Sequence, residues 1–211
     1  MSPRRPDLSR ADVPAGRLKA DVETLKSRLP SPPPPVRNPY LVLMCGLPGA
    51  GKSHFARLLA AETPLQIIES DAARKALVRT PAYNAEENRR VFGACRMLME
   101  ELLEGGIPVL LDATNVTERD RGTAYAVAEE KRVELAVVKA TAPEQEIRRR
   151  LRRREQGLSR DGASDAGWDT YIRMKAREEP VARPHYVVDT SRDVMPAVVK
   201  IANRLKAING H

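Results

Sequence analysis

Cysteines and long apolar runs are both scarce in this chain of 211 residues. Its two cysteines, Cys45 and Cys95, are too few for a disulfide framework, and we expect them to be reduced thiols in the core. No apolar run approaches the roughly 20 residues needed to span a bilayer, and the first residues lack the apolar core of a signal peptide. We therefore expect a cytoplasmic protein with no membrane partner.

Aromatic residues make up only 4% of the chain, whereas an excess of basic residues gives a net charge of +8. Such a balance favours polyanionic partners, whether nucleotides, phosphorylated metabolites or nucleic acid, without choosing among them. The length suits one α/β domain with an appended arm and excludes a two-domain enzyme.

The first 38 residues differ from the rest in composition. Apolar residues recur there at helical spacing and predict a helix over 15–29, and the prolines at 32–35 predict a semi-rigid linker behind it. We thus divide the chain into a helical arm with a Pro-rich linker, 1–38, and one domain, 39–211. The arm could pack on that domain, on a second copy or on nothing.

Strand-like and helical segments alternate after residue 39. This alternation predicts a three-layer α/β fold, in which a five-stranded parallel sheet carries helices on both faces and ligands bind at the carboxyl ends of the strands. The predicted strands are 41–45, 65–69, 107–112, 133–140 and 186–189, and the predicted helices are 52–61, 72–78, 85–104, 117–131, 143–155, 168–178 and 194–207.

A Gly-rich turn joins the first of these strands to its helix. Gly46, Gly51, Lys52 and Ser53 fit the pattern G-x-x-x-x-G-K-[ST], in the order strand, loop, helix that a phosphate-binding loop requires. Glycines let backbone N–H groups approach a triphosphate, Lys52 can reach its β- and γ-phosphates, and the Ser53 hydroxyl can hold Mg²⁺. The predicted ATP-binding residues are Gly46, Leu47, Pro48, Gly49, Ala50, Gly51, Lys52, Ser53 and His54.

The second predicted strand leads to Asp71, and Arg74 follows one helical turn later on the next predicted helix. Asp71 can accept the proton of an attacking hydroxyl, and Arg74 can grip a polar or anionic group of the acceptor. The alternatives are an N-cap for Asp71 and a solvated surface charge for Arg74. Tyr83, in the following loop, is a further candidate for contact with the acceptor.

The third strand ends at Asp112, with Thr114 and Asn115 just beyond it. A carboxylate at this place can join the Mg²⁺ shell, directly or through water, together with Ser53. Thr114 and Asn115 would then line the acceptor pocket. The alternative is a capped turn in which these residues hold the next helix.

Six arginines fall within the seven residues 148–154 and cannot all face one way on a helix. Arg150 and Arg154 share a face, and a guanidinium suits the charge that spreads over phosphoryl oxygens during transfer. This helix leads into a loop-like stretch, so we predict a small lid over about 150–168 that excludes water. A solvated basic face or a nucleic-acid patch is the alternative for most of the cluster.

These motifs, in this order, together with Ser164-Asp165-Ala166, make residues 39–208 resemble the AAA-33 type kinases. Those are small phosphate-loop kinases related to the kinase domain of polynucleotide 5′-hydroxyl kinase, and more distantly to gluconate kinase, chloramphenicol phosphotransferase and zeta-toxin. The resemblance implies that Asp71 is the general base, that Arg74 binds the acceptor, and that Arg150 and Arg154 are lid arginines. Polynucleotide kinases lack so clear an aspartate at the place of Asp112, and they do not usually carry the Ser164-Asp-Ala166 sequence.

The sequence therefore predicts a kinase that transfers the γ-phosphate of ATP, with Mg²⁺, to a hydroxyl acceptor, with Asp71, Lys52, Arg150 and Arg154 as catalytic residues. The favoured acceptor is a 5′-hydroxyl polynucleotide, because of the net charge and the Asp71-x-x-Arg74 spacing. The alternative is a small molecule such as a sugar, an antibiotic or another metabolite. A third hypothesis is a nucleotide-dependent switch or motor ATPase.

Overall fold

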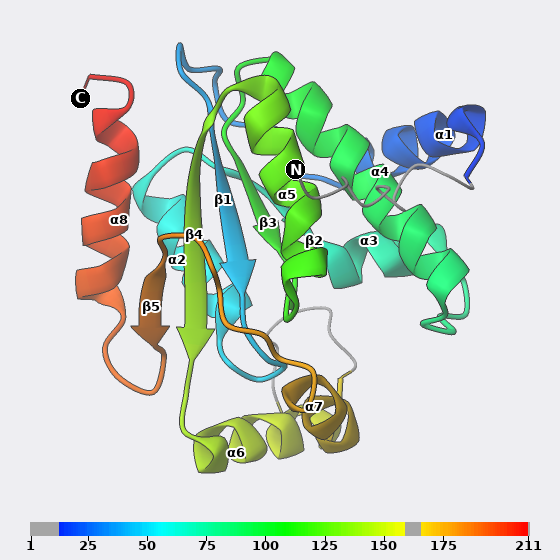
Figure 1. Ribbon diagram of the computed structural model, residues 1–211, viewed down its shortest axis with the longest axis vertical. Helices are drawn as coiled ribbons and strands as arrows, with labels where there is room; N and C mark the ends of the chain where they lie inside the picture. The colour runs from blue at the N-terminus through cyan, green and yellow to red at the C-terminus, as the bar shows by residue number, and fades with distance from the viewer. Residues whose placement is uncertain (1–12, 159–165, 211) are drawn as a thin grey trace, which may run out of the picture.

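The computed structural model describes residues 13–158 and 166–210. Helices and strands alternate in it as the sequence predicts (Figure 1). In chain order they are α1 (Ala15–Lys26), β1 (Tyr40–Cys45), α2 (Lys52–Glu62), β2 (Gln66–Glu69), α3 (Ser70–Leu77), α4 (Ala85–Glu104), β3 (Val109–Asp112), α5 (Glu118–Lys131), β4 (Glu134–Thr141), α6 (Glu144–Glu155), α7 (Trp168–Lys175), β5 (Tyr186–Asp189) and α8 (Met195–Ala207).

All five strands form one parallel sheet in the order β2-β3-β1-β4-β5, which confirms the predicted fold class. β1 is central, and its six residues are all buried because helices cover both of its faces. The connection after β1 runs toward the β2 edge of the sheet, and the connection after β4 runs in the opposite direction, toward the β5 edge. The carboxyl ends of β1 and β4 therefore form the kind of crevice in which open α/β sheets bind ligands.

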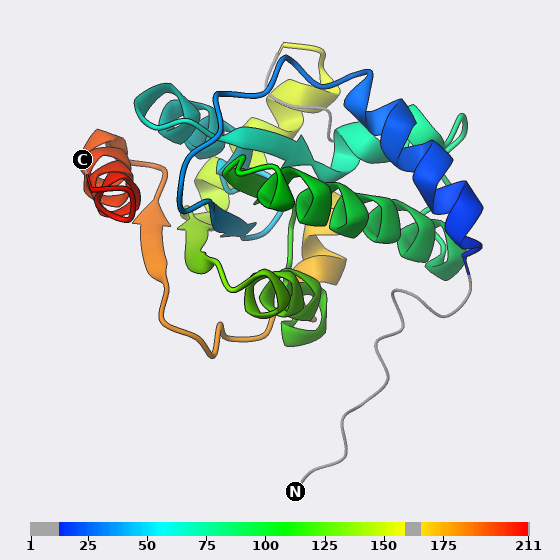
Figure 2. The same ribbon diagram turned by 90° about the horizontal axis from the view of Figure 1, so that it is seen from above.

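Two helix layers cover the sheet, and successive side chains of β1 point alternately toward one layer and the other. Leu41 and Leu43 join the core under α1, α3, α4 and α5, whereas Val42 and Met44 join the core under α2 and α8. Figure 2 shows α2 and α8 on one side of the sheet and α4 and α5 on the other. α6 and α7 lie beyond the carboxyl ends of β1 and β4 (Figure 1).

The N-terminal helix α1 packs on the domain. Its buried Leu18, Val22 and Leu25 belong to the same core as β1 and α4, as their helical spacing allows. Asp21, also buried, accepts two hydrogen bonds from the Arg90 guanidinium at 2.7 and 2.8 Å. Of the three placements that the sequence left open for this helix, the structure shows the first; residues 1–12 lie outside the described part.

Both cysteines are buried, unpaired core residues, as predicted. Burial raises the pKa of each thiol to about 12, so both stay protonated near neutral pH and are poor nucleophiles. Among the helices that the structure describes, none combines the length and the apolar character that a bilayer crossing requires.

Candidate active site

The predicted phosphate-binding loop lies between β1 and α2. The Gly46 N–H donates to the Thr114 carbonyl at 2.9 Å, and a side chain at Gly46 would stand 2.4 Å from the Ala140 carbonyl oxygen. Gly51, at φ 84°, caps α2 in the left-handed conformation. Glycine is needed at both places because one has no room for a Cβ and the other has a backbone that L-residues avoid. The loop backbone is therefore fixed before any ligand binds.

Lys52, at the first position of α2, points back under this loop. Its side chain is 9% exposed, and Nζ donates to the Leu47 carbonyl at 3.1 Å. Burial lowers the pKa of Lys52, and the nearby carboxylates of Asp112 and Asp71 oppose that shift. The ammonium thus lies where a phosphate would replace a carbonyl as its partner.

Ser53 and Asp112 form the candidate Mg²⁺ site. Asp112 ends β3 directly beside Met44 of β1, is 5% exposed, and lines the cleft together with Ser53, whose hydroxyl acts on its pKa. Burial raises the pKa of Asp112, while Lys52 and Ser53 act against that rise. A buried carboxylate paired with a hydroxyl at the start of the P-loop helix is a suitable oxygen donor set for Mg²⁺.

Asp71 lies in the first turn of α3 and lines the same cleft, of about 400 Å³, as Lys52 and Ser53. The helix N-cap is Glu69, without a side-chain cap, so the structure does not use Asp71 as the N-cap. Thr114 and His54, both predicted site residues, also line this cleft. The cleft therefore brings together Asp71 from the start of α3, the buried Lys52, and Ser53 with Asp112.

The two predicted lid arginines lie in different surroundings. Arg150 is fully engaged: Nη1 donates to the Gly49 carbonyl at 3.2 Å and to Thr190 Oγ1 at 2.8 Å, and Nη2 donates to the Thr190 carbonyl at 2.8 Å. Its Nε donates to Glu146 at 2.9 Å. Arg150 thus joins α6 to the phosphate-binding loop and to the end of β5.

Arg154, one turn further along α6, lines the cleft near Lys52, whose pKa its charge helps to lower. Its buried Nε has no hydrogen-bond partner among the residues that the structure describes. Arg154 lies near the buried lysine and its Nε is unsatisfied, whereas the donors of Arg150 are engaged, so Arg154 is better placed than Arg150 to receive an anion. The middle of the predicted lid, including Ser164 and Asp165, lies outside the described residues.

Three residues predicted to touch the acceptor do not line the cleft. Arg74 is 5% exposed and turns toward α4, where it pairs with Glu87 and donates to Asn88 Oδ1 at 2.6 Å. Tyr83 is 53% exposed and packs its ring on Arg74, with the guanidinium carbon 4.8 Å from the ring centroid. Asn115 is buried and donates from Nδ2 to the Met44 carbonyl at 2.8 Å.

Arg74 and Asn115 lie away from the cleft because each finds a polar partner elsewhere in the fold. The Glu87 carboxylate also accepts hydrogen bonds from the backbone N–H groups of Ala82 and Tyr83, so it holds Arg74 in a polar network under the loop before α4, in which the two Nη atoms of Arg74 have partners and its Nε has none among the described residues. Asn115 lies at φ 46° in the turn after β3, and the helix-cap alternative for that stretch is met by Thr117, which caps α5 together with Asp120.

Several cleft residues were missed by the sequence analysis. Thr190 and Glu69 directly follow or end parallel strands, a position that could have marked them. Burial raises the pKa of Glu69, and Asp112 and Asp71 add to the rise. Arg149 and Arg153 on α6 were indicated only as members of the arginine cluster, and the sequence analysis gave no signal for the other missed cleft residues, Ser70, Ala113, Glu146 and Leu158.

A glycine-rich loop after the central strand, a buried lysine behind it and a Ser–Asp pair beside it together define a P-loop nucleotide-binding protein with a kinase-like fold. Solved structures share this fold. The Mycobacterium tuberculosis APS kinase CysC, in complex with AMPPNP and APS, superposes with a TM-score of 0.63 at 18% identity, over 82% of this chain and 99% of that one. Chaetomium thermophilum Kti12, in complex with ADP-AlF3, gives 0.62 at 20% identity, over 81% and 100%. A Janibacter sugar kinase gives 0.60 at 16% identity, over 82% and 99%.

The particular family is shown by sequence. The model of the AAA_33 family, described as an AAA domain, matches residues 41–181, and the chain belongs to this family. A UPF0200 protein of Aeropyrum pernix is 34% identical over 134 residues, which cover 57% of this chain and 68% of that relative.

Proposed function

We propose that this protein is a kinase that transfers the γ-phosphate of ATP to a hydroxyl group of an acceptor. The observation that carries the proposal is the position of Asp71 in the same cleft as Lys52 and the Ser53–Asp112 pair. A P-loop protein that only switches or moves needs no carboxylate at the place of Asp71, just after β2, whereas an acceptor hydroxyl needs a group to take its proton.

Each side chain has a distinct part in this reaction. The loop N–H groups and Lys52 bind the β- and γ-phosphates, Arg154 faces the charge that develops on the transferred group, and Asp71 accepts the proton from the acceptor oxygen. Ser53 and Asp112 would hold Mg²⁺, which when bound neutralises phosphate charge. Arg150 acts through the loop, because its donors already hold Gly49 and Thr190.

The favoured acceptor is the 5′-hydroxyl end of a polynucleotide. Arg149 and Arg153 line the cleft and, like Arg148 and Arg152, are exposed on α6, where successive backbone phosphates could contact them. The resemblance to the polynucleotide kinase domain favours the same acceptor. On this proposal, acceptor binding weakens steeply as salt rises.

A small-molecule acceptor is the second candidate, and two observations favour it. The acceptor end of the cleft carries the acidic Glu69 and Asp71, and no Phe, Tyr or Trp side chain lines the cleft within the described residues. Stacking on bases therefore has no platform there.

An acceptor screen with γ-labelled ATP distinguishes these candidates. The panel holds 5′-hydroxyl DNA and RNA, sugars, nucleosides and aminoglycosides, each tested at low and high salt. Transfer of label to the oligonucleotides, lost at high salt, supports the favoured proposal, and transfer to a metabolite at both salt levels supports the second. ATP hydrolysis with no labelled acceptor in any well would contradict both and favour a nucleotide switch.

A further inference from the structure

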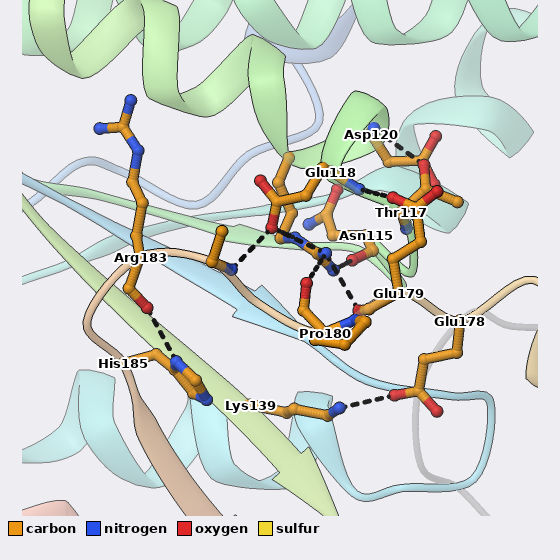
Figure 3. A network of polar contacts seen from close by, with 12 residues as sticks. Asn115, Thr117, Glu118, Asp120, Lys139, Glu178, Glu179, Pro180, Arg183 and His185 are labelled. Atoms are coloured by element: carbon orange, nitrogen blue, oxygen red, sulfur yellow. Dashed lines mark hydrogen bonds and ion pairs between the residues drawn. The ribbon is translucent and has the colours of Figure 1, made fainter.

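A buried arginine on α5 joins two segments that flank the candidate active site. Arg121 is 1% exposed. Its Nη1 donates to the Asn115 carbonyl at 2.8 Å, and its Nη2 donates to the carbonyls of Glu179 and Pro180 at 3.1 and 2.9 Å. Its Nε donates to Glu118 at 2.9 Å. Figure 3 shows these partners converging from α5, from the turn after β3 and from the segment that leads to β5.

The first of these contacts leads to the root of the phosphate-binding loop. Asn115 holds the Met44 carbonyl of β1 through its side chain, and the neighbouring Thr114 carbonyl accepts the Gly46 N–H. One turn therefore connects Arg121 to the last residues before the loop. Asn115 keeps a left-handed backbone there, at φ 46°, a cost that the buried contacts on both sides of it offset.

The second contact leads to the return segment, residues 176–185, which runs from α7 to β5. The Glu179 N–H donates to the Val116 carbonyl at 2.9 Å, and the Ala182 N–H donates to Glu118 Oε1 at 3.0 Å. The Glu118 N–H in turn donates to the Glu179 carboxylate at 2.7 Å. The return segment is thus fastened to the start of α5 by several bonds, with the Arg121 guanidinium at their centre.

α7 and α6 in turn lie over the loop. Leu47 of the loop belongs to a small apolar cluster with Ile147 and Leu151 of α6 and Tyr171 of α7. A side chain added at Gly49 would stand 3.0 Å from Ile147 and 3.2 Å from Leu151. The position of α7 therefore affects where α6 presents its arginines relative to the loop.

Only arginine can make this set of contacts. The acceptors are three backbone carbonyls and one carboxylate, spread over separate segments and directions, which a planar fork of five donors satisfies and a single ammonium does not. Arg121 itself does not line the cleft, so any effect on chemistry passes through the residues that it holds.

We propose that Arg121 is a positioning residue that fixes the return segment and the root of the phosphate-binding loop relative to each other, so that the arginines of α6 face Lys52 at the correct distance. The kinetic part of this inference rests on the proposed kinase function. Its structural part does not, because the coupling between the two segments is measurable without any acceptor.

Hydrogen exchange of the full chain tests the coupling. In Arg121→Met, and to a smaller extent in Arg121→Lys, we expect amides at 179–182 and also at 46–53 to exchange about tenfold faster or more, with α8 unchanged. Arg119→Met, an exposed arginine of the same helix, is the matched control and should match the wild type. Faster exchange confined to α5 and 179–182 would overturn the proposal.

A double-mutant cycle tests the route. Asn115→Gly removes the bond to Met44 but tolerates the left-handed backbone. We expect Arg121→Met and Asn115→Gly each to lower kcat by about 10- to 100-fold, with the KM for ATP changed less than about threefold, and the double variant to be little worse than either. Additive losses would contradict a shared route.

If Arg121→Met fails to fold, a milder variant, Glu118→Ala, still tests the coupling. Glu118→Ala removes one partner of Arg121 and the acceptor of the Ala182 N–H, at a side chain that is 36% exposed. The same two exchange regions should then respond with smaller amplitude, and no response at 46–53 would overturn the proposal. If no acceptor is phosphorylated by the wild type, the kinase function fails while these exchange results still decide the coupling.

Discussion

The nucleotide half and the acceptor half of the cleft are built in different ways. The nucleotide half, as proposed above, consists of consecutive residues, 46–53, in which Gly46 has no room for a Cβ and Gly51 has a left-handed backbone. The acceptor half consists of side chains at the ends of β2 and β3, and the fold decides which of them face the cleft. Glu87, 13 positions after Arg74, draws that arginine out of the cleft, whereas Asp71 stays in it.

This contrast teaches that a binding site formed by backbone groups can be predicted from the local spacing of residues. The position of a long side chain in a site depends instead on partners that are distant in the sequence. It also predicts how the two halves respond to substitution. Changes in the nucleotide half should affect catalysis and leave folding intact, and changes at Arg74 should do the reverse.

The largest expected effect is that of Lys52→Met. Removal of the ammonium takes away a preorganised charge at the phosphates, and we expect turnover to fall by about 10²- to 10³-fold. The variant should still fold, because Lys52 makes one hydrogen bond within the protein, to Leu47. Steady-state kinetics and a thermal melt check both points, with Lys75→Met on the exposed face of α3 as control. Equal turnover in the two variants would contradict the role of Lys52.

Arg154→Met should lower turnover by about 10- to 100-fold, since its side chain lines the cleft near Lys52 and its buried Nε has no partner within residues 13–158 and 166–210. Arg152→Met removes the same charge from the same helix on an exposed side outside the cleft. The ratio of the two turnover numbers isolates position from net charge. A ratio near one would show that the cluster acts only as a general basic field.

Arg74→Met should destabilise the fold and leave the acceptor KM nearly unchanged. Loss of the guanidinium leaves the buried Glu87 carboxylate without its charged partner, which costs about 2 to 4 kcal/mol of unfolding free energy. Urea denaturation measures this loss, and adding Glu87→Gln should recover part of it. A tenfold rise in acceptor KM at unchanged stability would instead restore the acceptor-binding role predicted from the sequence.

The smallest effect concerns pH. Burial, Asp112 and Asp71 raise the pKa of Glu69, so the folded state binds this proton more tightly than the unfolded state does. Stability is therefore lost as pH rises from the ordinary value of a glutamate through the raised one. Glu69→Gln should leave the melting temperature unchanged below that window and raise it by roughly 1 to 3 °C above it. A gain in stability at low pH alone would contradict the direction of the shift.

The fold was predictable almost in full, because the alternation of apolar strands and amphipathic helices follows from burial on both faces of a parallel sheet. The loop, Lys52 and Asp112 were predictable from motif and strand ends. Arg74, Tyr83 and Asn115 were not, since their partners, Glu87 for Arg74 and Met44 for Asn115, come from elements that local spacing does not relate to them. Thr190 was missed because it carries no motif of its own.

The central claim is that Asp71, in the first turn of α3, serves the chemistry of the phosphate-binding loop. The most direct measurement is single-turnover phosphoryl transfer by Asp71→Asn, made beside its equilibrium affinity for ATP. We predict transfer slower by about 100-fold or more, as expected for loss of a positioned base, with the Kd for ATP within about twofold of the wild type. Transfer at the wild-type rate would contradict the claim and leave nucleotide binding as the function of the cleft.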